Sequence, residues 1–178
     1  MFGPANQASF LLDIEGSAHD LRVLEFTGKE AISQPFRFDL KLVSERPDLD
    51  LESLLHRTAY LSFDGHGAGI HGQVYSVGQG DAGKRLTQYQ LSLMPGLAWL
   101  GHRFDQKIFQ KLSVPQIIAQ VLESHGILGD RYRFALGTDY RPRDYCVQYG
   151  ESCLNFLQRL CEEEGLHYHF EHSREGHV

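Results

Sequence analysis

The sequence predicts a mixed α+β fold that is mainly β: an antiparallel, barrel-like first module, followed by an α+β module with two amphipathic helices. Three observations support this prediction. Apolar and polar residues alternate through much of the first half of the chain, which is the period of half-buried strands. After Pro95 and Gly96 the apolar period lengthens to that of helices. The 178 residues, 42% of them hydrophobic and 22% charged, suffice to bury a core.

The clearest strand signal is PFRFDLKLVS, residues 35–44. Its apolar residues occupy every second position and charged residues stand between them, so one face is expected to be buried and the other solvated. The apolar set is Phe36, Phe38, Leu40 and Leu42. This segment is expected to be a half-buried antiparallel strand.

Further strands are predicted on both sides of this segment. LRVLEF (21–26) and AYLSF (59–63) are rich in β-branched and aromatic residues, and Gly28 and Pro35 are expected to interrupt the early strands. Asp50 can cap a short helix through LESLLHR, before the second of these strands.

GQVYSV and LTQYQLSL are two β-rich runs separated by GQGDAGK, which predicts a hairpin with a long tip. Gly78, Gly80 and Gly83 spell G-x-G-x-x-G, a pattern that in a dinucleotide-binding fold opens a helix whose N-terminus meets a pyrophosphate. Residues 86–93 instead alternate with period two. A strand is therefore predicted where that fold requires a helix, and no nucleotide site is indicated.

Two helices are predicted after this point. Ser113 and Gln116 form a capping pair before an apolar stripe that ends near Gly126. A second helix is expected to start at Ser152 and to stop at Gly165. The stripes comprise Val114, Ile117, Ile118, Val121 and Leu122 in the first helix, and Cys153, Leu157, Leu160 and Cys161, broadened by Leu154 and Phe156, in the second. The change of pattern between residues 93 and 113 predicts two modules, 1–95 and 96–178.

Composition excludes several classes of protein. A formal net charge of −6 argues against a nucleic-acid partner, because contacts with the phosphate backbone need clustered Lys and Arg. The sequence has no uncharged apolar run of about 18 residues and no signal-peptide pattern at its start, so we expect cytoplasmic synthesis without stable membrane insertion. Cys146, Cys153 and Cys161 are an odd number, which favours reduced thiols packed as small core residues.

The stretch LCEEEGLHYHFEH is the candidate metal site. If the chain is extended after Gly165, His167, His169 and Glu171 lie on one face, and two imidazoles with a carboxylate can form a zinc site with an open position. Same-face residues of a strand lie about 7 Å apart, however, and no fourth ligand is evident. The alternative is a glycine-capped helix followed by a strand whose rings fill β positions. We therefore assign no catalytic residue, cofactor or metal.

The three glutamates before Gly165 lie at the negative end of the predicted helix dipole, where carboxylates are destabilising. This placement indicates an Arg or Lys partner from another segment. A solvated helix end is the alternative.

Four segments together resemble the N-terminal hub region of VgrG proteins, the trimeric spikes of type VI secretion systems, which are related to baseplate hubs of contractile phage tails. The segments are EFTGKEAISQPFRFDLKLVS (25–44), residues 89–95, KIFQKLSVPQII (107–118) and VQYGESCLNFLQRLCEEEGLHYHFEH (147–172). Gly96 departs from the family, which typically has a bulky aromatic residue at this position. His167 and His169 stand where the family usually has aromatic residues.

The resemblance implies two barrel-like β modules per chain, so that three chains present a six-fold-like ring to the hexameric tube protein Hcp. It also implies a homotrimer in the full-length protein, contacts with baseplate proteins and effectors, and secretion through the type VI apparatus after assembly in the cytoplasm. Residues 96–178 would be the start of a second hub module, truncated at the C-terminus. The resemblance implies no catalytic residues in this region.

Three alternatives to a structural type VI hub remain open at this point. The first is the baseplate hub of a phage-tail-like particle. The second is a metal-dependent hydrolase that uses the two histidines and the glutamate of the candidate metal site. The third is a binding module in which Tyr75, Tyr89 and Trp99 recognise a glycan or an effector.

Overall fold

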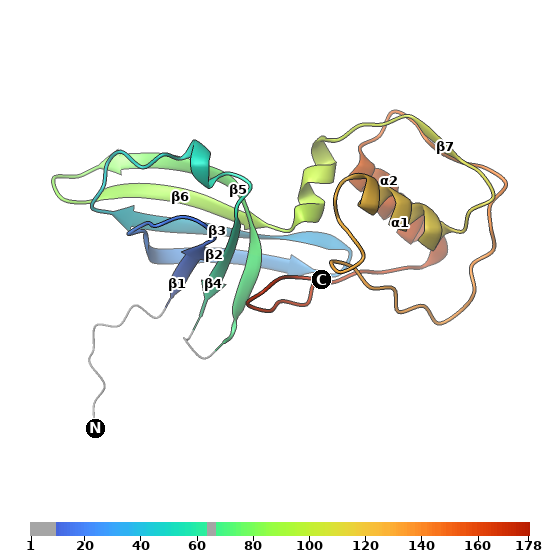
Figure 1. Ribbon diagram of the computed structural model, residues 1–178, viewed down its shortest axis with the longest axis horizontal. Coiled ribbons are helices and arrows are strands. Elements are labelled where there is room, and N and C mark those ends of the chain that lie inside the picture. The colour runs from blue at the N-terminus through green and yellow to red at the C-terminus, as the bar shows by residue number, and fades with distance from the viewer. Residues whose placement is uncertain (1–9, 64–66) are drawn as a thin grey trace, which may run out of the picture. The chain divides into compact units, whose positions relative to one another are not determined.

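The computed structural model describes residues 10–63 and 67–178, which form two compact units. Unit 1 contains the described residues up to Glu30, with Phe36–Pro95 and Glu171–His177, and unit 2 contains Ala31–Pro35, Gly96–Phe170 and Val178. Figure 1 shows the strands of unit 1 in blue to green, and the helices α1 and α2 of unit 2 in yellow to orange-red. Among the described residues, no helix is both long enough and apolar enough to cross a membrane.

Unit 1 is built on a six-stranded sheet with the order β1-β4-β5-β6-β3-β2. Its strands are β1 (Leu11–Ile14), β2 (Arg22–Ala31), β3 (Gln34–Ser44), β4 (Thr58–Ser62), β5 (Gly69–Ala82) and β6 (Thr87–Met94). The pairs β1–β4, β4–β5, β5–β6 and β6–β3 are antiparallel. The predicted short helix is a single 3-10 turn, η1 (Glu52–Leu54), where the Ser53 N–H donates to Asp50 Oδ1 at 3.3 Å.

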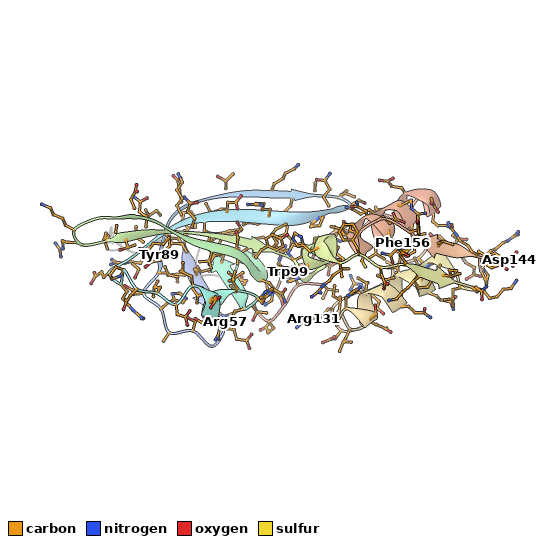
Figure 2. The ribbon with its side chains drawn as sticks, turned by 90° about the horizontal axis from the view of Figure 1, so that it is seen from above. Arg57, Tyr89, Trp99, Arg131, Asp144 and Phe156 are labelled. Carbon is orange, nitrogen blue, oxygen red and sulfur yellow. The ribbon has the colours of Figure 1, made fainter. Side chains whose placement is uncertain are left out.

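The inner face of the sheet carries the core that the alternating pattern predicts. The four alternating apolar residues of the predicted inner face, Phe36, Phe38, Leu40 and Leu42, are at most 6% exposed, and the charged residues between them are solvated. On the neighbouring strand β6, Tyr89, Leu91 and Leu93 are buried in the same way. Tyr89, labelled in Figure 2, also donates its hydroxyl hydrogen to the Arg46 carbonyl oxygen at 2.7 Å.

Aromatic contacts show that the sheet curves into a half-barrel. Phe26 belongs to the edge strand β2, yet its ring stacks on Phe63, just after β4, with centroids 5.4 Å apart. The ring of Phe10, just before the opposite edge strand β1, meets Phe26 edge-on at 5.1 Å. The two ends of the strand order therefore share one aromatic interior, as the barrel-like prediction for the first module requires.

Gly28 and Pro35 do not interrupt strands, contrary to the prediction. Strand β2 continues through Gly28 to Ala31, and Pro35 lies within β3. A Cβ at Gly28 would lie only 2.1 Å from Cε1 of Phe38, so the ring of Phe38 occupies the space that a side chain would need. This glycine permits close packing between neighbouring strands.

The β5–β6 hairpin forms as predicted, but its tip is shorter. Strand β5 runs through Gly78 and Gly80 to Ala82, and the turn closes where the Gly83 N–H donates to the Leu86 carbonyl oxygen at 2.9 Å. A register shift between Gln79 and Ala82 lets pairing continue through the glycine-rich stretch. The glycines of the G-x-G-x-x-G pattern are thus part of a hairpin, and a strand follows them.

Unit 2 contains both helices and a two-stranded ribbon. Its elements are η2 (Gly96–His102), β7 (Lys107–Phe109), α1 (Val114–Ser124), β8 (Cys146–Gln148) and α2 (Cys153–Glu164). Helix α1 has the Ser113–Gln116 capping box. Helix α2 begins where Ser152 Oγ accepts the Asn155 N–H at 3.1 Å, and ends at Gly165 with φ 67°.

The core of unit 2 lies between the helices and the inner face of the ribbon. It comprises Leu100, Phe109, Val114, Ile117, Ile118, Val121, Leu122, Cys146, Cys153, Phe156, Leu157, Leu160 and Cys161. The three cysteines are free and buried, as predicted. Burial raises the pKa of the Cys146 and Cys161 thiols, which keeps them protonated near neutral pH.

Candidate interaction surface

The β7–β8 ribbon of unit 2 separates an apolar interior from an exposed apolar face. Ile108 pairs directly with Val147, and Phe109 pairs with Cys146. Phe109 and Cys146 are buried in the core, whereas Ile108 and Val147 are 67% and 47% exposed. Because side chains alternate along a strand, the second pair projects from the outer face.

Aromatic side chains extend this outer face. Tyr145 and Tyr149 lie two residues on either side of Val147 and are 68% and 75% exposed. Phe104, which forms an isolated bridge with Ser152, is 72% exposed. From the usual area of such side chains, the patch exposes on the order of 500 Å² of apolar surface. We call Phe104, Ile108, Tyr145, Val147 and Tyr149 the ribbon face.

Charged groups near the ribbon are paired. The Lys107 ammonium lies 2.6 Å from the Asp105 carboxylate, and Lys111 pairs with Asp144. The Lys107 ammonium also lowers the pKa of the Asp105 carboxyl through its hydrogen bond. The ribbon face itself contains no charged side chain.

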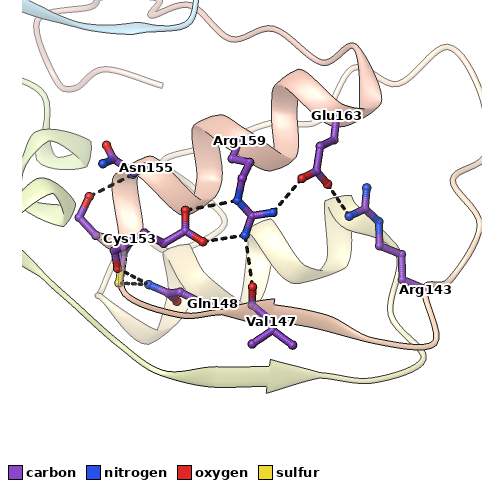
Figure 3. Close-up of polar contacts among 9 residues, drawn as sticks. Arg143, Val147, Gln148, Cys153, Asn155, Arg159 and Glu163 are labelled. Carbon is purple, nitrogen blue, oxygen red and sulfur yellow. Dashed lines mark hydrogen bonds and ion pairs between the residues drawn. The ribbon is translucent and has the colours of Figure 1, made fainter.

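Arg159 holds strand β8 against helix α2. Its guanidinium donates to both carboxylate oxygens of Glu151, at 2.6 and 3.3 Å, and to the Val147 carbonyl oxygen at 3.2 Å. It also donates to Glu163 at 2.7 Å, one turn further along the helix. Figure 3 shows these contacts, with the Val147 side chain pointing away from the helix. The Arg159 guanidinium thus fixes the main chain of the strand at Val147, while the Val147 side chain remains on the outer face.

Arg143 is the partner that the run of glutamates predicts. Its guanidinium donates to Glu163 at 2.6 Å and also to Glu164, both in the last turn of α2. Hydrogen bonds from Arg143 and then Arg159 lower the pKa of the Glu163 carboxyl. Hydrogen bonds to Glu164 and then Glu163 raise the pKa of the Arg143 guanidinium, and hydrogen bonds to Glu151 and then Glu163 raise that of Arg159, so both guanidinium groups stay charged near neutral pH. The unfavourable position at the helix terminus is thereby compensated.

A buried polar cluster lies behind the ribbon. Gln148 Nε2 lies 3.4 Å from both the Glu151 carbonyl oxygen and Cys153 Sγ, and Cys153 Sγ lies 3.4 Å from His125 Nε2. Among the described buried side chains, Gln148 Oε1 has no hydrogen-bond partner. Burial, followed by the charges of Lys107 and Arg103, lowers the pKa of His125. Because Cys153 is only 1% exposed, the thiol–imidazole contact belongs to the core.

The structure does not assemble the predicted candidate metal ligands into a site. His167, His169 and Glu171 are exposed, and they alternate with half-buried side chains as expected for an extended segment. Within residues 10–63 and 67–178, no three His, Cys, Asp or Glu side chains are grouped so that they could hold a metal ion.

The aromatic residues named for a binding module are not an exposed set. Tyr89 is only 1% exposed, and Tyr75 and Trp99 are half-buried. The binding-module alternative needs Tyr89 on the surface, and it is wrong on this point because the Tyr89 ring lies on the inner face of β6. Among the described residues, the three most exposed aromatic side chains, Phe104, Tyr145 and Tyr149, instead lie on the ribbon face. Its strands of three residues leave too short a pattern to recognise in the sequence.

Comparisons with known proteins identify the family. The model of the phage tail baseplate hub (GPD) family matches residues 29–178. The chain is 62% identical over 178 residues to the type VI secretion system spike protein VgrG4b of Pseudomonas aeruginosa, and 63% identical over 179 residues to VgrG5 of that organism. All of this chain is aligned in both cases, but it spans only 22% and 23% of those relatives.

A solved structure shows the same fold. It is that of the E. coli c3393 protein, a component of the type VI secretion system with structural similarity to the T4 bacteriophage tail proteins gp27 and gp5. The TM-score is 0.91 at 30% identity, over 94% of this chain and 47% of that chain. The resemblance to VgrG spikes found in the sequence is thereby confirmed. Since the family model covers most of the sequence, the chain belongs to the phage tail baseplate hub family.

Proposed function

We propose that this chain is a structural part of a type VI secretion spike, at its baseplate hub. In the complete protein it trimerises and docks on the hexameric Hcp tube, and the assembled spike helps to puncture target cells and deliver effectors. Residues 1–95 form one hub module and residues 96–178 the start of a second. Identity of 62% to a spike protein over the whole chain supports this role.

The ribbon face carries the proposal on the structural side. Protein interfaces are depleted of charge at their centre and enriched in aromatic side chains, as this face is. An apolar patch on the order of 500 Å² equals the largest patch of a typical monomer and is more than half of the roughly 800 Å² that one partner buries in a standard interface. The face therefore suits a protein contact in the assembled spike.

The test replaces Ile108 and Tyr149 by aspartate in the full natural protein. For the parent protein, light scattering is expected to show a trimer and co-sedimentation is expected to show binding to Hcp rings. The I108D/Y149D variant is expected to lose either trimer formation or Hcp binding. The control is Leu128→Asp, which places the same charge at a leucine that is 57% exposed and lies outside the ribbon face. A parent protein that is monomeric and does not bind Hcp would refute the function. A double variant that behaves like the parent would refute the role of the face.

The baseplate hub of a phage-tail-like particle is the second candidate, because the matching family model describes a phage tail baseplate hub. Such a protein uses the same kind of contact with a different tube protein. Co-sedimentation with a phage-type tube protein, but not with Hcp, would favour it.

A further inference from the structure

A short hairpin within unit 1 brings three histidines together. His172 and His177 form an isolated antiparallel bridge, so that residues 171–177 fold back on themselves. We call this segment the histidine hairpin. Its two imidazole rings lie 4.8 and 5.7 Å from the ring of Phe36, which is fully buried. The third imidazole belongs to His71 of β5, which is 8% exposed.

The histidine hairpin lies beside the part of β5 that is not paired with β6. The pairing of β5 with β6 ends at Gln73 and Met94, so His71 lies beyond it. There the Nδ1 of His172 lies 3.2 Å from the His71 main-chain nitrogen and 3.1 Å from its carbonyl oxygen. The Nε2 of the same ring lies 3.0 Å from Glu30 Oε1, on β2. One imidazole therefore replaces a missing strand partner.

His172 can keep these contacts whether it is neutral or charged. In the neutral ring with hydrogen on Nε2, that N–H donates to Glu30 and Nδ1 accepts the His71 N–H. In the imidazolium, Nδ1–H donates to the His71 carbonyl oxygen and Nε2–H still donates to Glu30. Protonation of this ring thus exchanges one hydrogen bond for another.

The contact between His71 and His177 does not have this tolerance. The two Nδ1 atoms lie 3.0 Å apart, and the ring centroids 5.2 Å. A hydrogen bond at this distance requires a hydrogen on one nitrogen and a lone pair on the other. It survives when one of the rings is charged. When both are imidazolium ions, two N–H groups and two positive charges face each other, and the contact is repulsive.

Other charged groups also lie around the cluster. Asp13 of β1 lies 3.4 Å from the guanidinium of Arg174 in the hairpin, and that guanidinium lies 5.5 Å from the ring of Tyr60 on β4. Glu171 and Glu175 are exposed on the hairpin itself. Carboxylates ordinarily titrate near pH 4 and histidines near pH 6.5. Between about pH 7 and pH 5 the change in charge is therefore that of the imidazoles.

We propose that the His71–His177 contact is a pH-sensitive latch, which holds the histidine hairpin on β5 near neutral pH and releases it in mild acid. Release follows when both rings carry a proton, so the released state binds more protons than the docked one. Docking therefore weakens as the pH falls. The partner in this equilibrium is the proton alone, and the moving element is the hairpin.

The test is nuclear magnetic resonance of the chain between pH 8 and pH 5. We expect cross-relaxation between the rings of Phe36 and His177 at neutral pH and its loss below about pH 6, in the range where histidines titrate. The rings of His71 and His177 should titrate in two steps separated by about one pH unit or more, as coupled groups do. Cross-relaxation that persists at pH 5, or independent single titrations of the two rings, would overturn the proposal.

Three variants sharpen the test. In His177→Gln the amide can donate to the His71 ring without titrating, so the hairpin should stay docked at pH 5. His167→Gln, the control, removes an exposed imidazole outside the cluster and should release like the parent. Glu30→Gln removes the carboxylate that balances a charged His172, so release should move to higher pH. If the hairpin of His177→Gln does not dock even at neutral pH, the Glu30→Gln variant provides the test instead. A release pH for Glu30→Gln equal to that of the parent would then count against the latch.

Discussion

Replacing Gly28 by alanine tests the packing of β2 against β3. The added Cβ would lie 2.1, 2.4 and 2.7 Å from three carbon atoms of the Phe38 ring. Carbon atoms in ordinary contact are separated by about 3.5 Å or more. The ring or its strand must therefore move by roughly 1.4 Å to restore normal contact.

The Phe38 ring has little room for such a movement. It is 6% exposed, and its centroid lies 6.1 Å from those of both Phe26 and Phe36, and 6.5 Å from that of Phe63. Overpacking a well-filled core typically costs about 1 to 3 kcal/mol. We expect the upper part of this range, about 2 to 3 kcal/mol, which raises the unfolding equilibrium constant roughly 30- to 140-fold.

The assay is urea unfolding followed by circular dichroism, together with hydrogen exchange of the β2 and β3 amides. With a slope of about 2 kcal/mol/M, the midpoint should fall by about 1 to 1.5 M. Gly78→Ala in β5 is the matched control, since a Cβ there meets nothing within 4 Å. Adding Phe38→Leu to Gly28→Ala should recover part of the loss. A stability of Gly28→Ala within about 0.5 kcal/mol of the parent would refute the steric argument.

Two further predictions concern unit 2. Arg143→Met removes the ion pairs with the last turn of α2 and should lower the free energy of unfolding by roughly 1 kcal/mol. Salt screens such pairs, so the loss of stability should be smaller in about 1 M NaCl. Urea titrations at low and high salt check this, and an equal loss at both concentrations would contradict it. Burial lowers the pKa of His125 in the folded chain. Near and below about pH 6.5 the unfolded chain therefore binds more protons than the folded one, and the free energy of unfolding decreases as the pH is lowered. His125→Gln should flatten part of this slope between pH 7 and pH 5, and an unaltered slope in the same titrations would contradict it.

The predictions that hold depend on residues close together in the sequence. The period-two pattern of residues 35–44 requires only that one face of a strand be buried. The Ser113–Gln116 pair lies within the first turn of α1, and Gly165 lies directly after α2. Such signals keep their meaning wherever the element is placed in the fold.

The features that could not be predicted depend on residues far apart in the sequence. The role of Gly28 follows from the position of the Phe38 ring on another strand, which composition does not reveal. His71 and His172 are separated by 101 positions, and neither stands in a recognisable motif. Arg143 was expected only as an unnamed cation, because nothing local connects it to the end of α2.

The exchange of short segments between the two units has a consequence for synthesis on the ribosome. Unit 1 includes Glu171–His177, and these residues are synthesised only after most of unit 2, which follows Pro95. At about 5 to 20 residues per second, that interval lasts roughly 4 to 15 s. During this time the end of β5 that receives the histidine hairpin is uncovered in the nascent chain. The docking of this segment on unit 1 therefore waits for translation, and a cut between Pro95 and Gly96 would separate the rest of unit 1 from Glu171–His177.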